Sequence, residues 1–348
     1  MYGYSNMGTC IYNSKERDSL PEVFRIVLMG MIVFWHLVLY GRPSYSTSPL
    51  LLSLTTLTHV AVPCFVIMSG WYGIRPSIRG FVRLVVMVVF YSLLGLLFRA
   101  WLYKECITAY SVLSALSPLF HGRWWFIEVY LALYLTVPLL ESFVSQSNTR
   151  RVWIMAGFLW FVSFWLGQPS SWVGRLPLFY MLYLMGRTFN SRFSGGGKHP
   201  FMAFCACCAV SIVACQICSI LGGKWLVVYR IVFWNYSGPW LIISSMFLSL
   251  TFLDSGNNAG RFRSRLVNSM AAAVFPCYLI HEKNFISTIT YDWFGSVCHG
   301  EAAIIGWGCV ATFVILISCC CIDFVCRPIY SIVARSIAMR LSDVAAKV

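Results

Sequence analysis

A succession of long apolar stretches runs along most of this sequence, and it limits the chain to one class of fold. The first stretch, residues 23–41, reads VFRIVLMGMIVFWHLVLYG. A helix needs about 20 mostly apolar residues to cross a bilayer. Because only 11% of the residues are charged and 59% are hydrophobic, the chain has too few charges to cover a water-facing surface or to stay disordered. The sequence therefore predicts an all-α integral membrane protein.

Ten stretches are apolar enough to form transmembrane helices, so we expect about ten. The sixth is the weakest, because Pro177 opens it and Arg187 closes it. No internal repeat is evident, which favours a single ten-helix membrane domain over 23–323, between a cytoplasmic N-terminal segment at 1–22 and a basic tail at 324–348. The ten stretches are 23–41, 50–72, 80–99, 124–143, 152–167, 175–190, 201–221, 237–253, 268–288 and 302–323.

The distribution of Lys and Arg predicts that both termini are cytoplasmic. Basic residues collect in the cytoplasmic loops of membrane proteins. With ten helices and a cytoplasmic N-terminus, 18 of the 26 Lys and Arg lie on the cytoplasmic side and 8 lie outside. The tail from Arg327 onward has basic residues at helical spacing, and it either lies along the inner membrane surface or frays into solvent.

The net charge of +14 does not indicate nucleic-acid binding, because the charges form short clusters between apolar stretches. Such clusters set topology and meet anionic headgroups or ligands. Most of the 15 Cys lie inside apolar stretches, and the CxxC pair of Cys215 and Cys218 lacks the second pair that a zinc site needs. We therefore expect no metal and no tightly bound cofactor. The polar first 22 residues do not resemble a signal peptide.

Motifs of several other membrane activities are missing. The sequence contains no GxxxxGK[ST] phosphate loop, no HExxH and no GxSxG. This argues against a nucleotide-driven pump, a membrane zinc protease and a serine hydrolase.

Arg25 and His36 form the first candidate site. Eleven residues turn a helix by about 1,100°, which is three turns and about 20°, so the two side chains share a helix face about 16 Å apart. Ionisable residues inside a membrane are costly and mark functional sites. His36 could act as a general base, and Arg25 could bind a phosphate at the cytoplasmic boundary. Equally, His36 could hydrogen-bond a neighbouring helix while Arg25 reaches the headgroups.

The short link after the second stretch carries Arg75, Arg79 and Arg83. Arg79 and Arg83 are four residues apart and share a helix face. Together with Arg25 they could bind a ligand with several phosphates. From the residues alone, anchoring on the cytoplasmic side explains them better.

Further ionisable residues lie near the outer ends of other stretches. Glu128 follows Trp125 in the fourth stretch, and His281 precedes Glu282 in the ninth. These residues either line a polar cavity or belong to the interfacial belt and the water-facing helix end. His59, within the second stretch, is a weaker cavity candidate.

Four motifs occur in a particular order along about residues 22–330. They are Arg25-x10-His36, the run VPCFVIMSGWYGIRPSIRGFVR with Ser69-Gly70 before the basic link, the run RWWFIEVYLALYLTVPLL, and YLIH at Tyr278–His281. In order and spacing they resemble the acyltransferase family 3 of integral membrane O-acyltransferases. The basic link lacks the adjacent arginine pair of some members, so the resemblance does not fix which arginines hold the donor.

The resemblance implies an enzyme of the bacterial cytoplasmic membrane that transfers an acyl group, usually acetyl, from acyl-CoA to a hydroxyl of a cell-surface or lipid-linked saccharide. His36 would be the general base, and Arg25 with Arg79 or Arg83 would bind the donor phosphates. The acceptor side would be lined by Trp125, Glu128, His281 and Glu282. Acetyl-CoA would be a co-substrate, and the partners would be the bilayer and a saccharide or glycolipid, with no nucleic acid.

Two other functions remain open. A transporter or flippase of a lipid-linked saccharide would use the same buried charges, and Pro63 and Pro276 could break its helices, although no inverted repeat is evident. A membrane scaffold without chemistry would not need His36 or Arg25.

Overall fold

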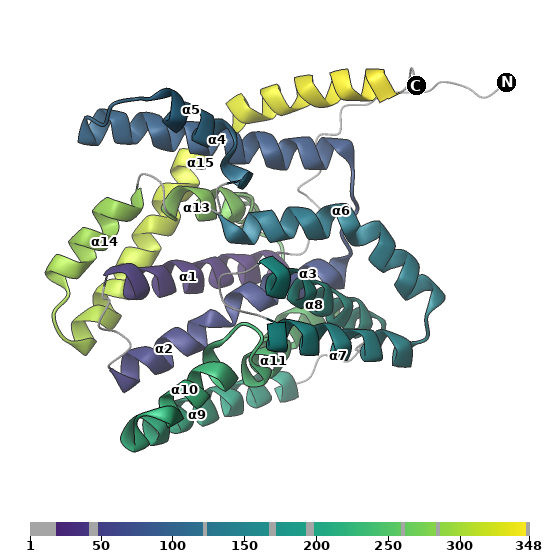
Figure 1. The fold of residues 1–348 in the computed structure, drawn as a ribbon, viewed down its shortest axis with the longest axis vertical. Coiled ribbons are helices and arrows are strands. Elements are labelled where there is room, and N and C mark those ends of the chain that lie inside the picture. The colour runs from purple at the N-terminus through teal and green to yellow at the C-terminus, as the bar shows by residue number, and fades with distance from the viewer. Residues whose placement is uncertain are drawn as a thin grey trace.

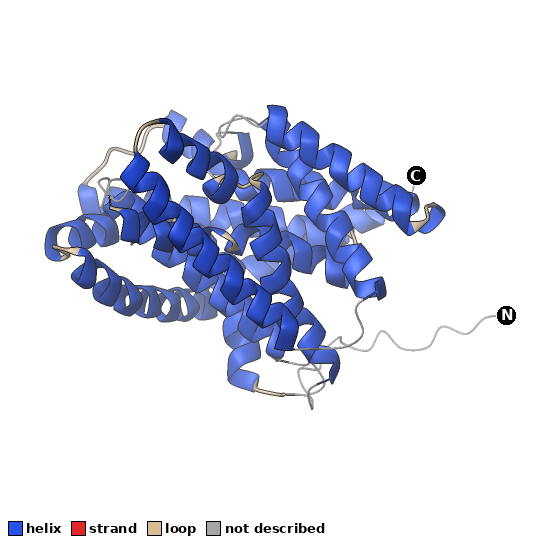
Figure 2. Cartoon of the chain, turned by 90° about the horizontal axis from the view of Figure 1, so that it is seen from below, coloured by secondary structure: helices blue, strands red, loops and turns tan. Residues whose placement is uncertain are grey.

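The computed structural model describes residues 19–41, 48–120, 124–166, 172–192, 198–258, 262–282 and 286–345, and in this part every regular element is a helix (Figure 2). Most of the predicted N-terminal segment therefore lies outside the described residues. The elements are α1 (Leu20–Gly41), α2 (Pro49–His59), α3 (Ala61–Tyr72), α4 (Ile78–Tyr103), α5 (Ala109–Leu116), the 3-10 helix η2 (Pro118–Phe120), α6 (Trp125–Gln146), α7 (Thr149–Leu166), α8 (Trp172–Arg192), α9 (Lys198–Leu221), α10 (Lys224–Tyr229), the π-helix η3 (Arg230–Trp234), α11 (Pro239–Asn258), α12 (Arg265–Ala271), α13 (Val274–His281), α14 (Ile286–Val297) and α15 (Glu301–Ala345).

Nine of the ten predicted stretches coincide with one helix or with two consecutive ones. The stretch 268–288 covers parts of α12, α13 and α14 and includes residues 283–285, which lie outside the described part of the chain. Among the described residues, seven segments are long and apolar enough to cross a membrane: Leu20–Gly41, Pro49–Tyr72, Ile78–Tyr103, Trp125–Gln146, His199–Leu221, Lys224–Leu253 and Glu301–Asp343. Helices α7 and α8 and the pair α12–α13 are not among them. The number of crossings and the side of each terminus therefore stay predictions.

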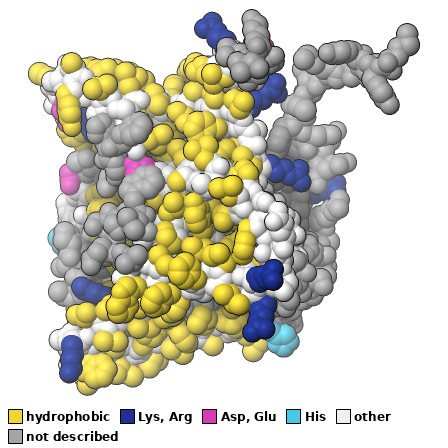
Figure 3. Space-filling view, turned by 45° about the vertical axis from the view of Figure 1, so that its right-hand side comes forward, with side chains coloured by type: hydrophobic (Ala, Val, Ile, Leu, Met, Phe, Trp, Pro, Cys, Tyr) yellow, Lys and Arg dark blue, Asp and Glu magenta, His cyan; other side chains and the backbone are white. Residues whose placement is uncertain are grey.

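Large apolar side chains cover much of the outer surface. Trp165, Ile220 and Phe324, from three different helices, are each more than 70% exposed. Figure 3 shows one such face, with hydrophobic side chains across it and Lys and Arg mainly toward its edges. Exposing so much apolar surface to water would cost free energy, whereas exposing it to lipid does not. The chain is an all-α membrane protein.

Helix α1 lies in the middle of the molecule (Figure 1) and packs against α2, α3, α11, α12, α13, α14 and α15. Phe24, Leu28, Val33 and Leu37 of α1 are completely buried in these contacts. His36 is 6% exposed. A helix that contacts so many others is a rigid support for a functional side chain.

Three helices are interrupted, and prolines explain the interruptions. Proline lacks the N–H that bonds the carbonyl four residues earlier. Pro63 therefore leaves the carbonyl of His59 without its helical donor where α2 gives way to α3, and Pro276 does the same for Ala272 between α12 and α13. The third break, at Asn235–Gly238, comes just before Pro239 opens α11. Inside a membrane, non-helical backbone is tolerated where it is buried in protein or lines a cavity.

Helices α3 and α8 approach each other most closely at two glycines. A Cβ atom on Gly70 would lie 2.2 Å from the carbonyl oxygen of Tyr183, and one on Gly186 would lie 2.1 Å from that of Ile67. Small residues allow such backbone contact between membrane helices.

Helix α15 is continuous across the predicted boundary between membrane domain and tail. It contains Pro328, and in Figure 1 its last part runs along the top of the molecule at an angle to its first part. Prolines cause such bends. The last part packs on α4 through Val82, Ala334 and Ala338.

A buried carboxylate that the sequence analysis did not single out ties α15 to α4. Asp323 is completely buried. It accepts hydrogen bonds from Tyr91 of α4 at 2.8 Å, from Tyr330 at 2.9 Å and from Arg327 Nε at 2.8 Å. The spacing of Asp323 and Arg327, four residues apart on one helix face, is the sequence signal that could have revealed this pair.

Candidate active site

The described residues enclose a cavity of about 1190 Å³ beside α1. It extends along the helix from Pro21 to Tyr40, nineteen residue steps that span about 28 Å of helix. Its wall includes residues from α2, α3, α4, α6, α8, η3, α13 and α15, and all three helix breaks contribute to it. A large, mainly apolar and aromatic cavity with a few polar groups is the usual form of a small-molecule site.

His36 lines this cavity and is hydrogen-bonded to a second histidine. Nδ1 of His36 lies 2.9 Å from Nε2 of His281, and Nδ1 of His281 lies 2.7 Å from the carbonyl oxygen of Cys277. A carbonyl can only accept, so Nδ1 of His281 carries the proton, and Nε2 of its neutral ring accepts from His36. Nδ1 of His36 is therefore the donor, and its lone pair lies on Nε2.

Three arginines line the opposite end of the cavity. Arg25 comes from α1, Arg75 from the link between α3 and α4, and Arg83 from the first turns of α4. Arg25 forms an ion pair of 3.3 Å with Glu22, which also lines the cavity. Arg79 is exposed and does not line it. The structure thus brings Arg25 and Arg83 together, with Arg75 instead of Arg79 as the third cation.

Two tyrosines fix the link that carries Arg75. The backbone N–H of Ser77 donates to Tyr134 Oη at 2.9 Å, and that of Ile74 donates to Tyr183 Oη at 3.3 Å. Gly80 makes room for the first contact, because a Cβ atom there would lie 2.4 Å from Tyr134 Oη.

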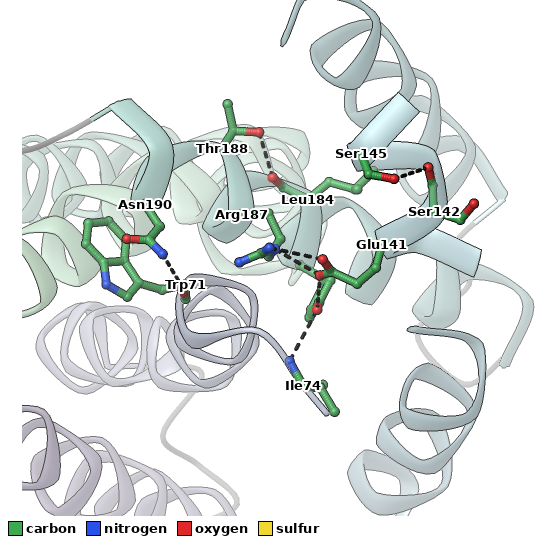
Figure 4. Close-up of polar contacts among 10 residues, drawn as sticks. Trp71, Ile74, Glu141, Ser142, Ser145, Leu184, Arg187, Thr188 and Asn190 are labelled. Carbon is green, nitrogen blue, oxygen red and sulfur yellow. Dashed lines mark hydrogen bonds and ion pairs between the residues drawn. The ribbon is translucent and has the colours of Figure 1, made fainter. Parts of the chain in front are cut away.

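Glu141 and Arg187 form a polar cluster between α6 and α8 (Figure 4), and Tyr183 belongs to it. Its hydroxyl donates to Glu141 at 2.6 Å, and Glu141 forms an ion pair of 2.9 Å with Arg187. The cluster holds Ile74, and with it the backbone next to Arg75, in a fixed place. Sequence reasoning missed Tyr183 and Glu141, whose partners are distant in the chain.

The four residues predicted for the acceptor side are all buried or half-buried near the end that contains His36. Trp125 and Glu282 line the cavity, whereas Glu128 and His281 do not. Glu128 is 4% and Glu282 2% exposed. Tyr236 connects this region to the third helix break, since its ring centroid lies 5.4 Å from that of Trp125.

Sequence reasoning missed Arg175 at this end. Its guanidinium lies over the ring of Trp125, 4.3 Å from the centroid. An arginine at this place is compatible with a membrane helix because the aromatic face and the cavity both accommodate its charge. Arg230, from η3, also lines the cavity.

Within the described part of the chain, no group of three or more His, Cys, Asp or Glu is placed to hold a metal ion. The described cysteines are free thiols. The cavity lining includes two histidines, five arginines and two carboxylates, which suits acid–base chemistry on an anionic ligand. His281 does not line the cavity itself but is hydrogen-bonded to His36, which does.

A family model described as an acyltransferase domain matches residues 20–323. The chain belongs to the acyltransferase 3 family. The match covers most of the chain and all the cavity helices through the first part of α15. No curated protein and no solved structure matches the chain. The protein is therefore a membrane acyltransferase, and its donor and acceptor must be inferred from the site.

Proposed function

We propose that this acyltransferase moves an acyl group, with acetyl as the first expectation, from acyl-CoA to a hydroxyl of a cell-surface or lipid-linked saccharide in a bacterial cytoplasmic membrane. The observation that carries the proposal is one cavity with a histidine pair near one end and three arginines at the other. A coenzyme A thioester has a polyanionic head and a long arm, and it fits a site with this separation of charge from chemistry.

His36 is the general base in this proposal. Its Nε2 removes the proton from the acceptor hydroxyl while the oxygen attacks the thioester carbonyl. The carbon–sulfur bond then breaks, the sulfur leaves with the proton returned by His36, and the products are an ester and free coenzyme A. His281 stabilises the imidazolium of His36 as it forms, because its Nε2 accepts the Nδ1 proton. A positioned general base contributes about 10²–10⁴-fold to rate.

The arginine end holds the donor. Arg25, Arg75 and Arg83 offer several N–H groups in planar geometry, which suits bidentate binding of phosphate. Acetyl-CoA enters as a co-substrate and leaves as coenzyme A.

The test uses purified protein in lipid nanodiscs with acetyl-CoA labelled in its acetyl group and a membrane glycan extract as acceptor. Wild type should produce a labelled, base-labile ester, and His36→Ala should lower its rate by about 10²–10⁴-fold. His199→Ala is the matched control, because His199 is exposed on α9 away from the cavity. Unchanged transfer by His36→Ala would remove His36 from the mechanism.

The three helix breaks at the cavity favour one second candidate, a transporter or flippase of a lipid-linked saccharide, because interrupted helices form the binding sites of many transporters. A transporter would change the amount of glycan at the cell surface without changing its ester content. Measuring both quantities in cells that express wild type or His36→Ala separates the two functions.

A further inference from the structure

An aromatic cluster lies beside His36 and has no role in the proposed mechanism. The imidazole of His59 stacks on the indole of Trp35 with ring centroids 4.9 Å apart and planes 12° apart. Its centroid lies 4.8 Å from that of Trp234 and 4.0 Å from that of Tyr236. All four side chains line the cavity. They come from α1, α2 and the region of η3, so two of the three helix breaks build this cluster.

The hydrogen bonds of His59 determine which of its nitrogens can bind a ligand. Nδ1 lies 2.7 Å from the carbonyl oxygen of Trp234. Nδ1 is therefore the donor, and Nε2 of the neutral ring is an acceptor. His59 is 4% exposed, and Nε2 has no hydrogen-bond partner among the described residues.

Two indole nitrogens of the same cluster are also unsatisfied. Nε1 of Trp35 and Nε1 of Trp234 are buried without a hydrogen-bond partner in the described part of the chain. Leaving a buried polar group unpaired costs about 1–3 kcal/mol, and such groups need an explanation. One acceptor and two donors in a single aromatic cluster are a pattern that a bound ligand could satisfy.

We propose that Trp35, His59, Trp234 and Tyr236 form the subsite that binds one sugar ring of the acceptor. A pyranose has apolar C–H faces, which pack on aromatic rings, and a rim of hydroxyls, each of which both donates and accepts hydrogen bonds. A ring hydroxyl donates to Nε2 of His59, and neighbouring oxygens accept from the indole N–H groups. This inference rests on the proposed function for the identity of the ligand as an acceptor.

The position of the cluster supports this assignment. Trp35 precedes His36 in α1, and the centroids of their two rings are 5.1 Å apart. A ring held against Trp35 therefore lies next to the base, and one of its hydroxyls can reach Nε2 of His36. The donor arginines lie far from this base, since Arg25 is eleven residues before His36 in the same helix, a separation of about 16 Å along the helix axis.

Packing alone would give the cluster a different role. His59 would then serve only to satisfy the carbonyl of Trp234, which the end of the π-helix leaves free of a helical donor. His59→Asn separates the two roles, because the asparagine side-chain N–H can replace Nδ1 at this carbonyl but offers nothing at the place of Nε2.

Binding is tested directly by saturation-transfer NMR on the protein in lipid nanodiscs. The probes are the methyl glycosides of glucose, galactose, mannose and N-acetylglucosamine, with coenzyme A as the donor probe. We expect ring-proton signals from at least one glycoside with wild type, and an affinity lower by about threefold to tenfold in His59→Asn, the loss expected for one hydrogen bond. Trp234→Leu should weaken binding at least as much.

Trp101→Leu is the matched control, because Trp101 is 67% exposed on α4 and does not line the cavity. It should bind like wild type. The thermal unfolding midpoint of His59→Asn should remain within a few degrees of wild type, which shows that the fold survives.

Three results would overturn the proposal. The first is no signal from any of the four glycosides with wild type, and the second is full glycoside binding by both His59→Asn and Trp234→Leu. The third is loss of coenzyme A binding alone in Trp234→Leu, which would assign the cluster to the donor arm. The measurement needs no acyl transfer. Glycoside binding without labelled ester in the transfer assay would therefore contradict the proposed function and leave the subsite intact.

Discussion

The imidazole of His36 gains its direction from His281. A neutral histidine can present its lone pair on either nitrogen, and a base that presents the wrong one cannot reach its substrate. The chain of hydrogen bonds from the Cys277 carbonyl through His281 to Nδ1 of His36 removes this ambiguity. In the proposed mechanism this hydrogen bond also strengthens during the reaction, because His36 would become a cation while it donates to His281.

This relay predicts that His281 affects catalysis more than donor binding. A hydrogen bond to a charged group contributes about 1.5–3 kcal/mol, which corresponds to about 10- to 150-fold in rate. His281→Leu should therefore lower kcat by that factor and leave the KM for acetyl-CoA nearly unchanged. His281→Gln should recover part of kcat, since its amide oxygen can accept the proton of His36.

His199→Leu serves as the control for the loss of a histidine that lies outside the cavity. Equal kcat values for His281→Leu and His281→Gln would contradict the relay, because a role in packing alone does not distinguish an acceptor from an apolar group. Steady-state kinetics with labelled acetyl-CoA measure both parameters.

Sequence reasoning could find Arg25 and His36 because both belong to one helix, whose geometry relates their faces. It could not find the contact with His281, because 245 residues separate the two histidines and only the packing of α1 on α13 joins them. Sequence reasoning also chose Arg79 as a donor-binding residue, because it shares a helix face with Arg83, whereas the residue that lines the cavity is Arg75. Helix α4 begins at Ile78, so Arg75 belongs to a loop whose direction no helical spacing predicts.

The placement of these arginines predicts unequal effects on the donor. Arg83 lines the cavity, whereas Arg79 does not. Exposed charge pairs contribute about 0.2–1 kcal/mol, so Arg83→Ala should raise the KM for acetyl-CoA by about 1.4-fold to fivefold. Arg79→Ala should change it less than Arg83→Ala does.

Both values should be measured at low and at high salt, because salt screens exposed charges. The difference between the two variants should shrink at high salt. A larger effect of Arg79→Ala would show that the donor phosphates bind outside the cavity mouth.

At the scale of elements, helix interruptions place the site. The stretches 50–72 and 268–288 look continuous in composition, but α2 gives way to α3 within the first and α12 gives way to α13 within the second, and residues next to both breaks line the cavity. Pro63 and Pro276 signal these breaks in the sequence. The π-helix at Arg230–Trp234 gave no such signal, because its geometry depends on the surrounding packing.

The contact between α3 and α8 depends on the absence of side chains at Gly70 and Gly186. Gly186→Ala would place a methyl group 2.1 Å from a carbonyl oxygen, and backbone atoms cannot rotate away as a side chain can. Overpacking costs about 1–3 kcal/mol. We expect a lower thermal unfolding midpoint in nanodiscs and weaker acyl transfer, since α3 leads directly into the link that carries Arg75.

Gly157→Ala is the matched control. Gly157 lies in α7, and beyond the adjoining backbone of its own helix no atom of the described residues lies within 4 Å of the place its Cβ would take. Alanine is the better helix former by about 1 kcal/mol, so this variant should be as stable as wild type or more stable. Equal midpoints for Gly157→Ala and Gly186→Ala would show that α3 and α8 are farther apart than described.

For the whole molecule, composition was sufficient to predict an all-α membrane protein, because the scarcity of charge leaves no other way to solvate the surface. The number of crossings is harder to predict. Helix α8 carries Arg175 and Arg187 inside its length and tolerates them because Trp125 and Glu141 lie opposite. Tertiary partners of this kind cannot be read from the hydropathy of one segment.

The cavity is consistent with the orientation that the charge bias predicts. Residues that the bias assigns to the cytoplasmic side, Arg25 and Arg83, line one end of the cavity. Trp125 and Arg175, which lie at helix ends assigned to the outside, line the region beyond His36. A donor confined to the cytoplasm would then meet the arginines first.

This orientation predicts the side of the membrane on which three points of the chain lie. In a bacterial host, a fluorescent protein fused after Val348 should fluoresce, and alkaline phosphatase fused there should be inactive. Phosphatase inserted in the loop between α4 and α5, at residues 104–108, should be active, whereas insertion after Gln146 should again give an inactive enzyme. The reason is that, in the predicted topology, α4 and α6 each cross the membrane once in opposite directions. Active phosphatase after Val348 together with an inactive insertion at 104–108 would reverse the orientation, and the arginine end of the cavity would then face away from cytoplasmic acyl-CoA.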